Sequence, residues 1–147
     1  METTPIPSVE EIPKRLLIVD DDPAVRTMVG RVLAGEGYAV RAAGDGYDAL
    51  ALAEAEPFDL VLLDLGLPPT NGWDIFSRLR TAHPLLPVII ITARFGEAGA
   101  ASLAGADALL EKPLDYPILL RTITQVLAAP VATRLAHRPR WPRTFHA

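Results

Sequence analysis

The sequence predicts an α/β fold in which a parallel β-sheet is covered by helices on both faces. Short apolar runs alternate with amphipathic stretches along most of the chain. Most of the runs are continuous, without polar residues at alternate positions, which is typical of strands buried on both faces. Strands that alternate with helices in this way indicate βαβ units, which are joined by right-handed crossovers in a parallel sheet.

Five strands are expected. The second is more mixed in polarity than the others and is flanked by Gly37 and Gly44, so we expect it at an edge of the sheet. Five alternating units of this length fit a flavodoxin-like, doubly wound (βα)5 fold with strand order 2-1-3-4-5. The strands are expected at 16–19, 38–41, 60–63, 88–91 and 108–110.

Five helices are expected between and after these strands. The first begins at Asp22-Pro23, which supplies an N-cap and a proline at the first helical position. Its apolar residues then recur at helical spacing, and Gly35 and Gly37 end it. The other helices are expected at 46–55, 72–82, 96–104 and 115–128, of which 96–104 is rich in Ala and Gly and makes a poor helix.

Composition and length indicate one globular domain. The chain has 147 residues, of which 50% are hydrophobic and 22% are charged, so it can bury a sizeable core. The domain is expected to span 14–128, because the strand and helix pattern is confined to that range. Residues 1–13 are expected to form a flexible tail. Residues 129–147, which are basic and rich in Pro and Arg, are expected to form a disordered tail.

Several classes of function are disfavoured by composition. The net charge of −4 favours neither nucleic acid nor an anionic membrane surface as a partner. Since there is no cysteine, disulfides, thiol nucleophiles and cysteine-based zinc sites are excluded. No apolar run approaches the roughly 18 residues of a membrane span, and no secretory signal is visible. We therefore expect a cytoplasmic protein.

Polar residues follow the ends of the buried strands. Asp20, Asp21 and Asp22 follow the first strand and Asp64 follows the third, while Thr92 and Lys112 end the fourth and fifth. In the expected strand order these ends meet at one edge of the sheet. Two carboxylates about 4 Å apart repel by about 4 kcal/mol at an effective dielectric constant of about 20, so the gathered acids would be unfavourable unless a cation or a proton compensates them. Carboxylate ligands favour Mg²⁺, and Asp64 is a candidate nucleophile for phosphoryl transfer.

At these residues the sequence resembles the receiver domain of two-component response regulators, a chemotaxis-regulator-like superfamily. The resemblance is carried by LLIVDDDPAVR (16–26), DLVLLDLGLPPTNGWDIFSRLR (59–80), PVIIITA (87–93) and GADALLEKPLD (105–115). It implies that Asp64 is the phosphoacceptor and that Mg²⁺ is held by Asp20, Asp21, Asp64 and the backbone carbonyl of Gly66. It also implies that Thr92 is the switch hydroxyl and that Lys112 pairs with the acceptor or the phosphate. The peptide bond between Lys112 and Pro113 is typically cis in the family. Asp22 is given no role in the site and is interpreted only as a helix cap.

The resemblance implies a single-domain response regulator in a Mg²⁺-dependent phosphorelay. A sensor histidine kinase or a histidine phosphotransfer protein would donate the phosphoryl group. Output would go through contacts with a downstream protein, which the sequence does not identify, and a homodimer is compatible with this function. Such a chain is a phosphoacceptor signalling domain that performs only its own phosphotransfer and dephosphorylation, and it is not an enzyme that turns over other substrates.

Two departures from the family pattern keep alternatives open. Leu109 stands where the family often has Tyr or Phe, and the segment from Thr92 to Lys112 is about two residues shorter than usual. One alternative is therefore a receiver-like binding module whose partner contacts do not depend on phosphorylation. An aspartate-nucleophile phosphatase is disfavoured, because Ala24 stands where that pattern has a hydroxyl residue or Val. Trp141 and Phe145 lie among the arginines of the C-terminal tail, yet a nucleic-acid partner is not expected.

Overall fold

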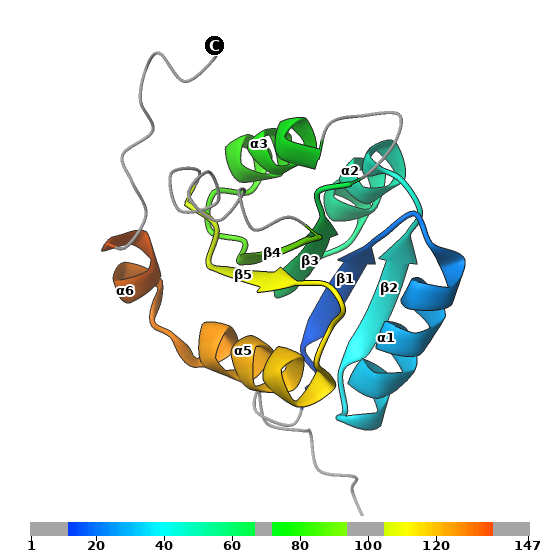
Figure 1. The fold of residues 1–147 in the computed structure, drawn as a ribbon. Helices are drawn as coiled ribbons and strands as arrows, with labels where there is room; N and C mark the ends of the chain where they lie inside the picture. The colour runs from blue at the N-terminus through cyan, green and yellow to red at the C-terminus, as the bar shows by residue number, and fades with distance from the viewer. Residues whose placement is uncertain (1–11, 67–71, 94–104, 137–147) are drawn as a thin grey trace, which may run out of the picture.

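A computed structural model describes residues 12–66, 72–93 and 105–136 of the chain. These residues form a parallel five-stranded sheet in the order β2-β1-β3-β4-β5 (Figure 1). The predicted fold class and strand order are therefore confirmed. The strands are β1 (Arg15–Val19), β2 (Ala39–Ala43), β3 (Leu60–Asp64), β4 (Val88–Thr92) and β5 (Ala108–Glu111).

The central strands form because their side chains are apolar on both faces. Every residue of β3 and β4 is buried, as are four of the five residues of β1. β2 lies at an edge and exposes most of its residues, as expected. Its bounds differ from the prediction at 38–41, because the strand pairs with β1 from Ala39 to Ala43. The end of β2 could not be located from the sequence, because Ala42 and Ala43 are small residues without the large apolar side chains that mark the other strands.

The described helices cover both faces of the sheet (Figure 1). Asp22, Asp45 and Asp115 cap α1, α2 and α5, and each carboxylate accepts a backbone N–H of the first turn. The predicted helix at 96–104 lies outside the described residues, as does the predicted tail at 1–13 except for its last two residues. The helices are α1 (Pro23–Gly35), α2 (Gly46–Ala55), α3 (Gly72–Ala82), α5 (Tyr116–Ala128) and α6 (Val131–Ala136).

The core consists of two layers, one on each face of the sheet. One layer packs α2 and α3 against side chains such as Val61 and Ile90, and includes Phe76. The other packs α1 and α5 against the opposite side chains of the same strands, such as Leu62 and Ile89. The alternation along each strand explains why the runs are apolar throughout. The sheet is thereby held rigidly enough to fix the residues at its strand ends.

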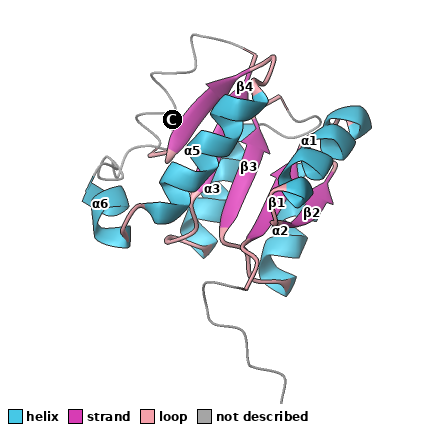
Figure 2. Ribbon diagram, turned by 90° about the horizontal axis from the view of Figure 1, so that it is seen from below, coloured by secondary structure: helices cyan, strands magenta, loops and turns pink. Residues whose placement is uncertain are grey.

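The C-terminal segment differs in part from the prediction of a disordered tail at 129–147. Val131–Ala136 form the short helix α6, which lies beyond the edge of the sheet formed by β5 (Figures 1 and 2). The rest of that segment, 137–147, lies outside the described residues. Within the described ranges, none of the helices combines the length and apolar character that a membrane crossing requires.

A cluster of buried charges holds α6 at the amino ends of β4 and β5. Arg80 of α3 contacts the Asp107 carboxylate at 3.3 Å and donates to the carbonyls of Leu86 at 2.8 Å and Gly105 at 3.2 Å. Asp107 also accepts the Val88 N–H at 2.8 Å. Arg134 of α6 reaches the other oxygen of Asp107 at 3.5 Å. The side chains of Arg80, Asp107 and Arg134 are 3%, 3% and 10% exposed, so these charged groups are shielded from solvent.

Gly72 is required by close packing at the opposite end of the sheet. A Cβ atom there would lie 2.5 Å from both the Cα and the carbonyl oxygen of Leu65, which follows β3. The steric reason is that the start of α3 rests directly on the backbone that leaves β3.

Candidate functional site

The carboxyl end of β1 supplies the first two acids of the site. Asp20 directly follows the strand and is 2% exposed, whereas Asp21 is exposed. The Asp20 carboxylate accepts the backbone N–H of Asp22 at 2.9 Å, which fixes the orientation of its side chain. Asp22 points away into the helix and accepts the Ala24 N–H at 2.8 Å. Its predicted role as a cap is confirmed.

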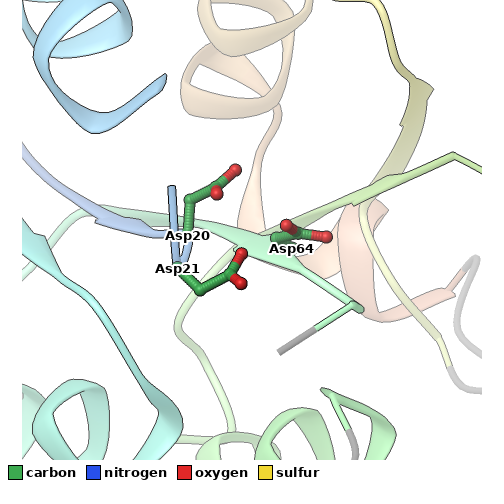
Figure 3. A group of neighbouring side chains, drawn as sticks. All are labelled: Asp20, Asp21 and Asp64. Atoms are coloured by element: carbon green, nitrogen blue, oxygen red, sulfur yellow. The ribbon is translucent and has the colours of Figure 1, made fainter. Parts of the chain in front are cut away.

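The neighbouring strand β3 supplies the third acid. Asp64 is the last residue of β3 and is 5% exposed, and its Oδ1 accepts the backbone N–H of Gly66 at 2.9 Å. Because β1 and β3 are paired in parallel, Asp20 and Asp64 leave the sheet side by side (Figure 3). Carboxylate oxygens of Asp20, Asp21 and Asp64 lie within 4.8 Å of one another.

Lys112 reaches this cluster from the far edge of the sheet. Its Nζ donates to Asp64 Oδ2 at 2.9 Å and to Asp20 Oδ2 at 3.1 Å. The residue follows β5, and its backbone N–H donates to the carbonyl of Thr92 at 2.8 Å. Thr92 is 2% exposed and ends β4, which lies between β3 and β5. The Lys112–Pro113 peptide bond is cis, as the resemblance implied.

Burial and mutual repulsion make this cluster unfavourable for free carboxylates. Burial raises the pKa of Asp20, and the nearby charge of Asp64 adds to this effect, although hydrogen bonds from Asp22 and Lys112 oppose it. Burial alone would lower the pKa of Lys112, but hydrogen bonds to Asp64 and Asp20 outweigh it and raise that pKa. Lys112 therefore stays protonated and offsets part of the negative charge.

The donor set fits a divalent cation with a preference for oxygen ligands. Three carboxylates converge on one space and meet one ammonium within the described part of the cluster. Hard carboxylate oxygens suit Mg²⁺ or a similar ion, and a cation would offset the repulsion between Asp20 and Asp64, which adds to the effect of burial on the pKa of Asp20. The site is also open to solvent, because Asp21 is exposed and Lys112 is 29% exposed.

Most of the residues predicted for the site lie together. Asp20, Asp21, Asp64 and Lys112 form one cluster, while Gly66 lies beside Asp64 and Thr92 ends the intervening strand. Sequence reasoning did not single out Arg26, whose guanidinium donates to the backbone carbonyl of Asp20 at 2.7 Å. Its position four residues after the helix cap could have suggested a side chain that folds back toward the strand end.

Comparison with known proteins supports the same interpretation. The family model of the response regulator receiver domain matches residues 16–124. The chain belongs to the response regulator receiver domain family. This assignment confirms the predicted resemblance and covers the strands and the helix α1 that carry the acids, as well as Thr92 and Lys112.

Curated relatives of this receiver chain are longer proteins. The transcriptional regulatory protein GlrR of Escherichia coli is 37% identical over 117 residues, which are 78% of this chain and 26% of GlrR. The response regulator MprA of Mycobacterium leprae is 38% identical over 115 residues, which are 77% of this chain and 50% of MprA. The chain thus spans about a quarter to a half of the length of these relatives.

Solved structures of receiver proteins match the whole described fold. A CheY-like receiver domain protein of Methanospirillum hungatei has a TM-score of 0.75 at 32% identity, over 84% of this chain and 98% of that one. The response regulator TrrA of Thermotoga maritima, solved in complex with Mg²⁺ and BeF, has a TM-score of 0.72 at 29% identity. That match covers 77% of this chain and 98% of TrrA.

Proposed function

We propose that this receiver accepts a phosphoryl group on Asp64 from a phosphohistidine of a sensor histidine kinase or a histidine phosphotransfer protein. The observation that supports this most is the position of the Asp64 carboxylate, between Lys112 Nζ and the Gly66 N–H and beside two further acids. A carboxylate oxygen would form the new P–O bond as the P–N bond breaks, and the imidazole nitrogen would keep the electron pair.

The residues proposed to hold Mg²⁺ are Asp20, Asp21, Asp64 and the backbone carbonyl of Gly66. When bound, the ion would neutralise charge on the acceptor and on the transferring phosphoryl oxygens. The complex of TrrA with Mg²⁺ and BeF supports the choice of metal by analogy. The acids of this chain hold the necessary geometry, because Asp20 is oriented by the Asp22 N–H and by Lys112.

Thr92 and Lys112 are proposed to receive the phosphoryl oxygens. The ammonium of Lys112 already contacts Asp64 Oδ2 at 2.9 Å, so it lies where a phosphoryl group attached to that carboxylate would carry its negative charge. The Thr92 hydroxyl belongs to the strand next to Asp64, and Thr92 pairs in register with Glu111, the residue before Lys112. Both groups can therefore respond to the same new charge.

We propose that the protein acts in the cytoplasm. The effect of phosphorylation would be transmitted through β4 and β5 to a surface that contacts a protein partner. Leu109 pairs with Ile90 and packs against the core layer that contains α2 and α3. Its side chain carries no hydroxyl group that could form a hydrogen bond, as a tyrosine at this position would. This observation favours the binding-module alternative as a second candidate. Partner affinity measured with and without Mg²⁺ and beryllofluoride separates the two, because an unchanged affinity supports the module.

A further question is whether the receiver acts on a protein or on nucleic acid. GlrR is named a transcriptional regulatory protein, and it is much longer than this chain. We propose that the receiver residues themselves contact protein and that any effect on nucleic acid is exerted through a separate domain or partner. Binding of duplex DNA by residues 14–128 alone, at physiological salt, would contradict this part of the proposal.

Phosphodonor labelling tests the acceptor. Purified chain is incubated with acetyl phosphate and Mg²⁺, and the added phosphate is mapped by mass spectrometry under conditions that preserve acyl phosphates. We expect one acid-labile phosphate on Asp64, and none in Asp64→Asn. Asp74→Asn is the matched control, because Asp74 is an exposed acid of α3 that pairs across the helix surface with Arg78. Full labelling of Asp64→Asn would refute the assignment.

A further inference from the structure

We propose that Arg26 is a positioning residue for the divalent cation, which it serves by fixing the backbone that carries Asp20 and Asp21. This inference rests on the proposed metal site but requires no phosphoryl transfer. Arg26 lies on α1, six residues after Asp20, and its Nη1 donates to the backbone carbonyl of Asp20 at 2.7 Å in a partly buried position. Within the part of the chain that the structure describes, its hydrogen bond is to the backbone of Asp20 and not to a carboxylate, so its effect passes through the backbone.

The contact fixes the peptide group between the two acids. The Asp20 carbonyl belongs to the peptide bond that leads into Asp21, so its orientation determines where Asp21 begins. On the other side, the Asp20 N–H donates to the carbonyl of Ala43 at 3.1 Å, which anchors the residue to β2. Arg26 therefore completes a clamp on the backbone of Asp20, with one attachment on each side of the residue.

Asp21 depends on this clamp more than Asp20 does. The Asp20 carboxylate is oriented by the Asp22 N–H at 2.9 Å and by Lys112 at 3.1 Å, and it is buried. Asp21 is exposed, and its carboxylate lies within 4.8 Å of the other two acids. A free backbone at this point would let Asp21 leave the cluster, because an exposed side chain gains rotational freedom by doing so.

Gly44 leaves room for the guanidinium. A Cβ atom at Gly44 would lie 3.1 Å from Arg26 Nη1 and 3.5 Å from its Cζ. Gly44 has no positive φ angle, so its backbone conformation does not require glycine. The space is instead occupied by Arg26, which links the end of β2, the end of β1 and α1 at one point. The structure thus holds the Arg26 guanidinium in a defined position, between the Asp20 carbonyl and Gly44.

The charge of Arg26 and its hydrogen bond have opposite effects on cation binding. A guanidinium near three carboxylates repels an incoming cation, so removing its charge alone would tighten Mg²⁺ binding. Removing the backbone anchor would weaken binding, because the acids would have to be ordered by the metal itself. The sign of the change in Mg²⁺ affinity therefore distinguishes a positioning role from a purely electrostatic one.

Isothermal titration of the full chain with MgCl₂ tests the inference. We expect Arg26→Met to weaken Mg²⁺ binding by about tenfold or more, as for other residues that orient metal ligands. Arg26→Lys should recover much of the affinity, since an ammonium can donate to the same carbonyl. Arg31→Met is the matched control: it removes the same charge from an exposed position on the same helix and should leave affinity unchanged or slightly higher.

Urea unfolding without Mg²⁺ verifies that each variant is folded. Unchanged or tighter binding in folded Arg26→Met would overturn the inference, as would absence of Mg²⁺ binding by the unmodified chain. If Arg26→Met does not fold, Gly44→Ala decides. It keeps the charge but displaces the guanidinium, so it should weaken binding by a smaller factor, and unchanged affinity would overturn the inference. Mg²⁺ binding without labelling of Asp64 would refute the proposed function alone.

Discussion

The two ends of the sheet both bury charged side chains, but they compensate them differently. At the amino end, Asp107 lies between the guanidinium groups of Arg80 and Arg134, and backbone carbonyls accept the remaining donors described above. At the carboxyl end, three carboxylates meet one ammonium, and one of the acids is exposed. In the first cluster two guanidinium groups of the chain itself compensate the carboxylate, whereas in the second the carboxylates outnumber the ammonium and a cation from solution would offset the excess charge.

This difference separates a structural charge cluster from a functional one. A buried cluster with balanced charges ties elements together, here α3, α6 and Asp107, the residue before β5. In the open cluster, burial raises the pKa of Asp20 and the charge of Asp64 adds to this effect, and the excess of negative charge favours binding of a counter-ion. Burial of charge alone would not have distinguished the two ends, since Asp20 and Asp107 are both almost completely buried.

The largest expected effect is at the amino end. Asp107→Ala should lower the free energy of unfolding by about 3–5 kcal/mol, because it leaves the buried guanidinium of Arg80 without its carboxylate. Urea unfolding followed by circular dichroism measures this loss. Asp74→Ala breaks an exposed ion pair on α3, the helix that also carries Arg80, and should lower the free energy of unfolding by less than about 1 kcal/mol. Equal losses in the two variants would contradict the structural role of the cluster.

The next effect distinguishes the ends by their response to metal. At a Mg²⁺ concentration a hundredfold above the dissociation constant, the free energy of unfolding should rise by about 2.7 kcal/mol. Asp21→Asn should lose most of this increment without loss of metal-free stability, because it removes one of three repelling carboxylates. Asp107→Asn should keep the whole increment. A stability gain from Mg²⁺ that survives in Asp21→Asn would remove that acid from the site.

A third prediction asks whether packing also holds the carboxyl end. Gly72→Ala should cost about 1–3 kcal/mol, because its Cβ would collide with the backbone of Leu65. Gly35→Ala is the control: that glycine ends α1 with open space around it, so alanine should leave stability unchanged or raise it by up to about 1 kcal/mol. Thermal and urea unfolding of both variants check the contrast. A neutral Gly72→Ala would show that the backbone relaxes at no cost.

The smallest expected effect concerns the attachment of α6. Arg134→Met should lower the free energy of unfolding by about 1 kcal/mol, because Arg80 still compensates Asp107 after the change. Hydrogen exchange should become faster in α6 and stay unchanged in β1 and β3. Arg121→Met, an exposed position on α5, is the matched control and should be neutral. A helix α6 that keeps its protection without Arg134 would assign its docking to other contacts.

The carboxyl end could be predicted from the sequence because its signals are local. Each of these candidate site residues lies at or just after the end of an apolar run, and the predicted strand order brings the run ends together. Asp20, Asp64 and Lys112 could therefore be placed at one edge of the sheet from the sequence. Helix caps such as Asp22 were predictable for the same reason. The end of β2 was not, because its small alanines carry no strong pattern.

The amino end could not be predicted because backbone groups form much of it. Arg80 belongs to an amphipathic helix, where an arginine usually lies at the surface, and its partners include the carbonyls of Leu86 and Gly105, which leave no trace in side-chain patterns. The helix α6 was missed because 129–147 is rich in proline and arginine, a composition that predicts no regular structure. What orders Arg134 is a contact with Asp107, 27 residues earlier, which no local pattern reveals.

The long reach of Lys112 has a consequence for biosynthesis. This residue joins acids that precede it by 92 and 48 positions, and it follows the last strand of the sheet. Ribosomes deliver the chain from its N-terminus, so Asp20 and Asp64 emerge before the ammonium that pairs with them. A nascent polypeptide therefore lacks the ion pairs of the candidate site until the edge strand joins the sheet.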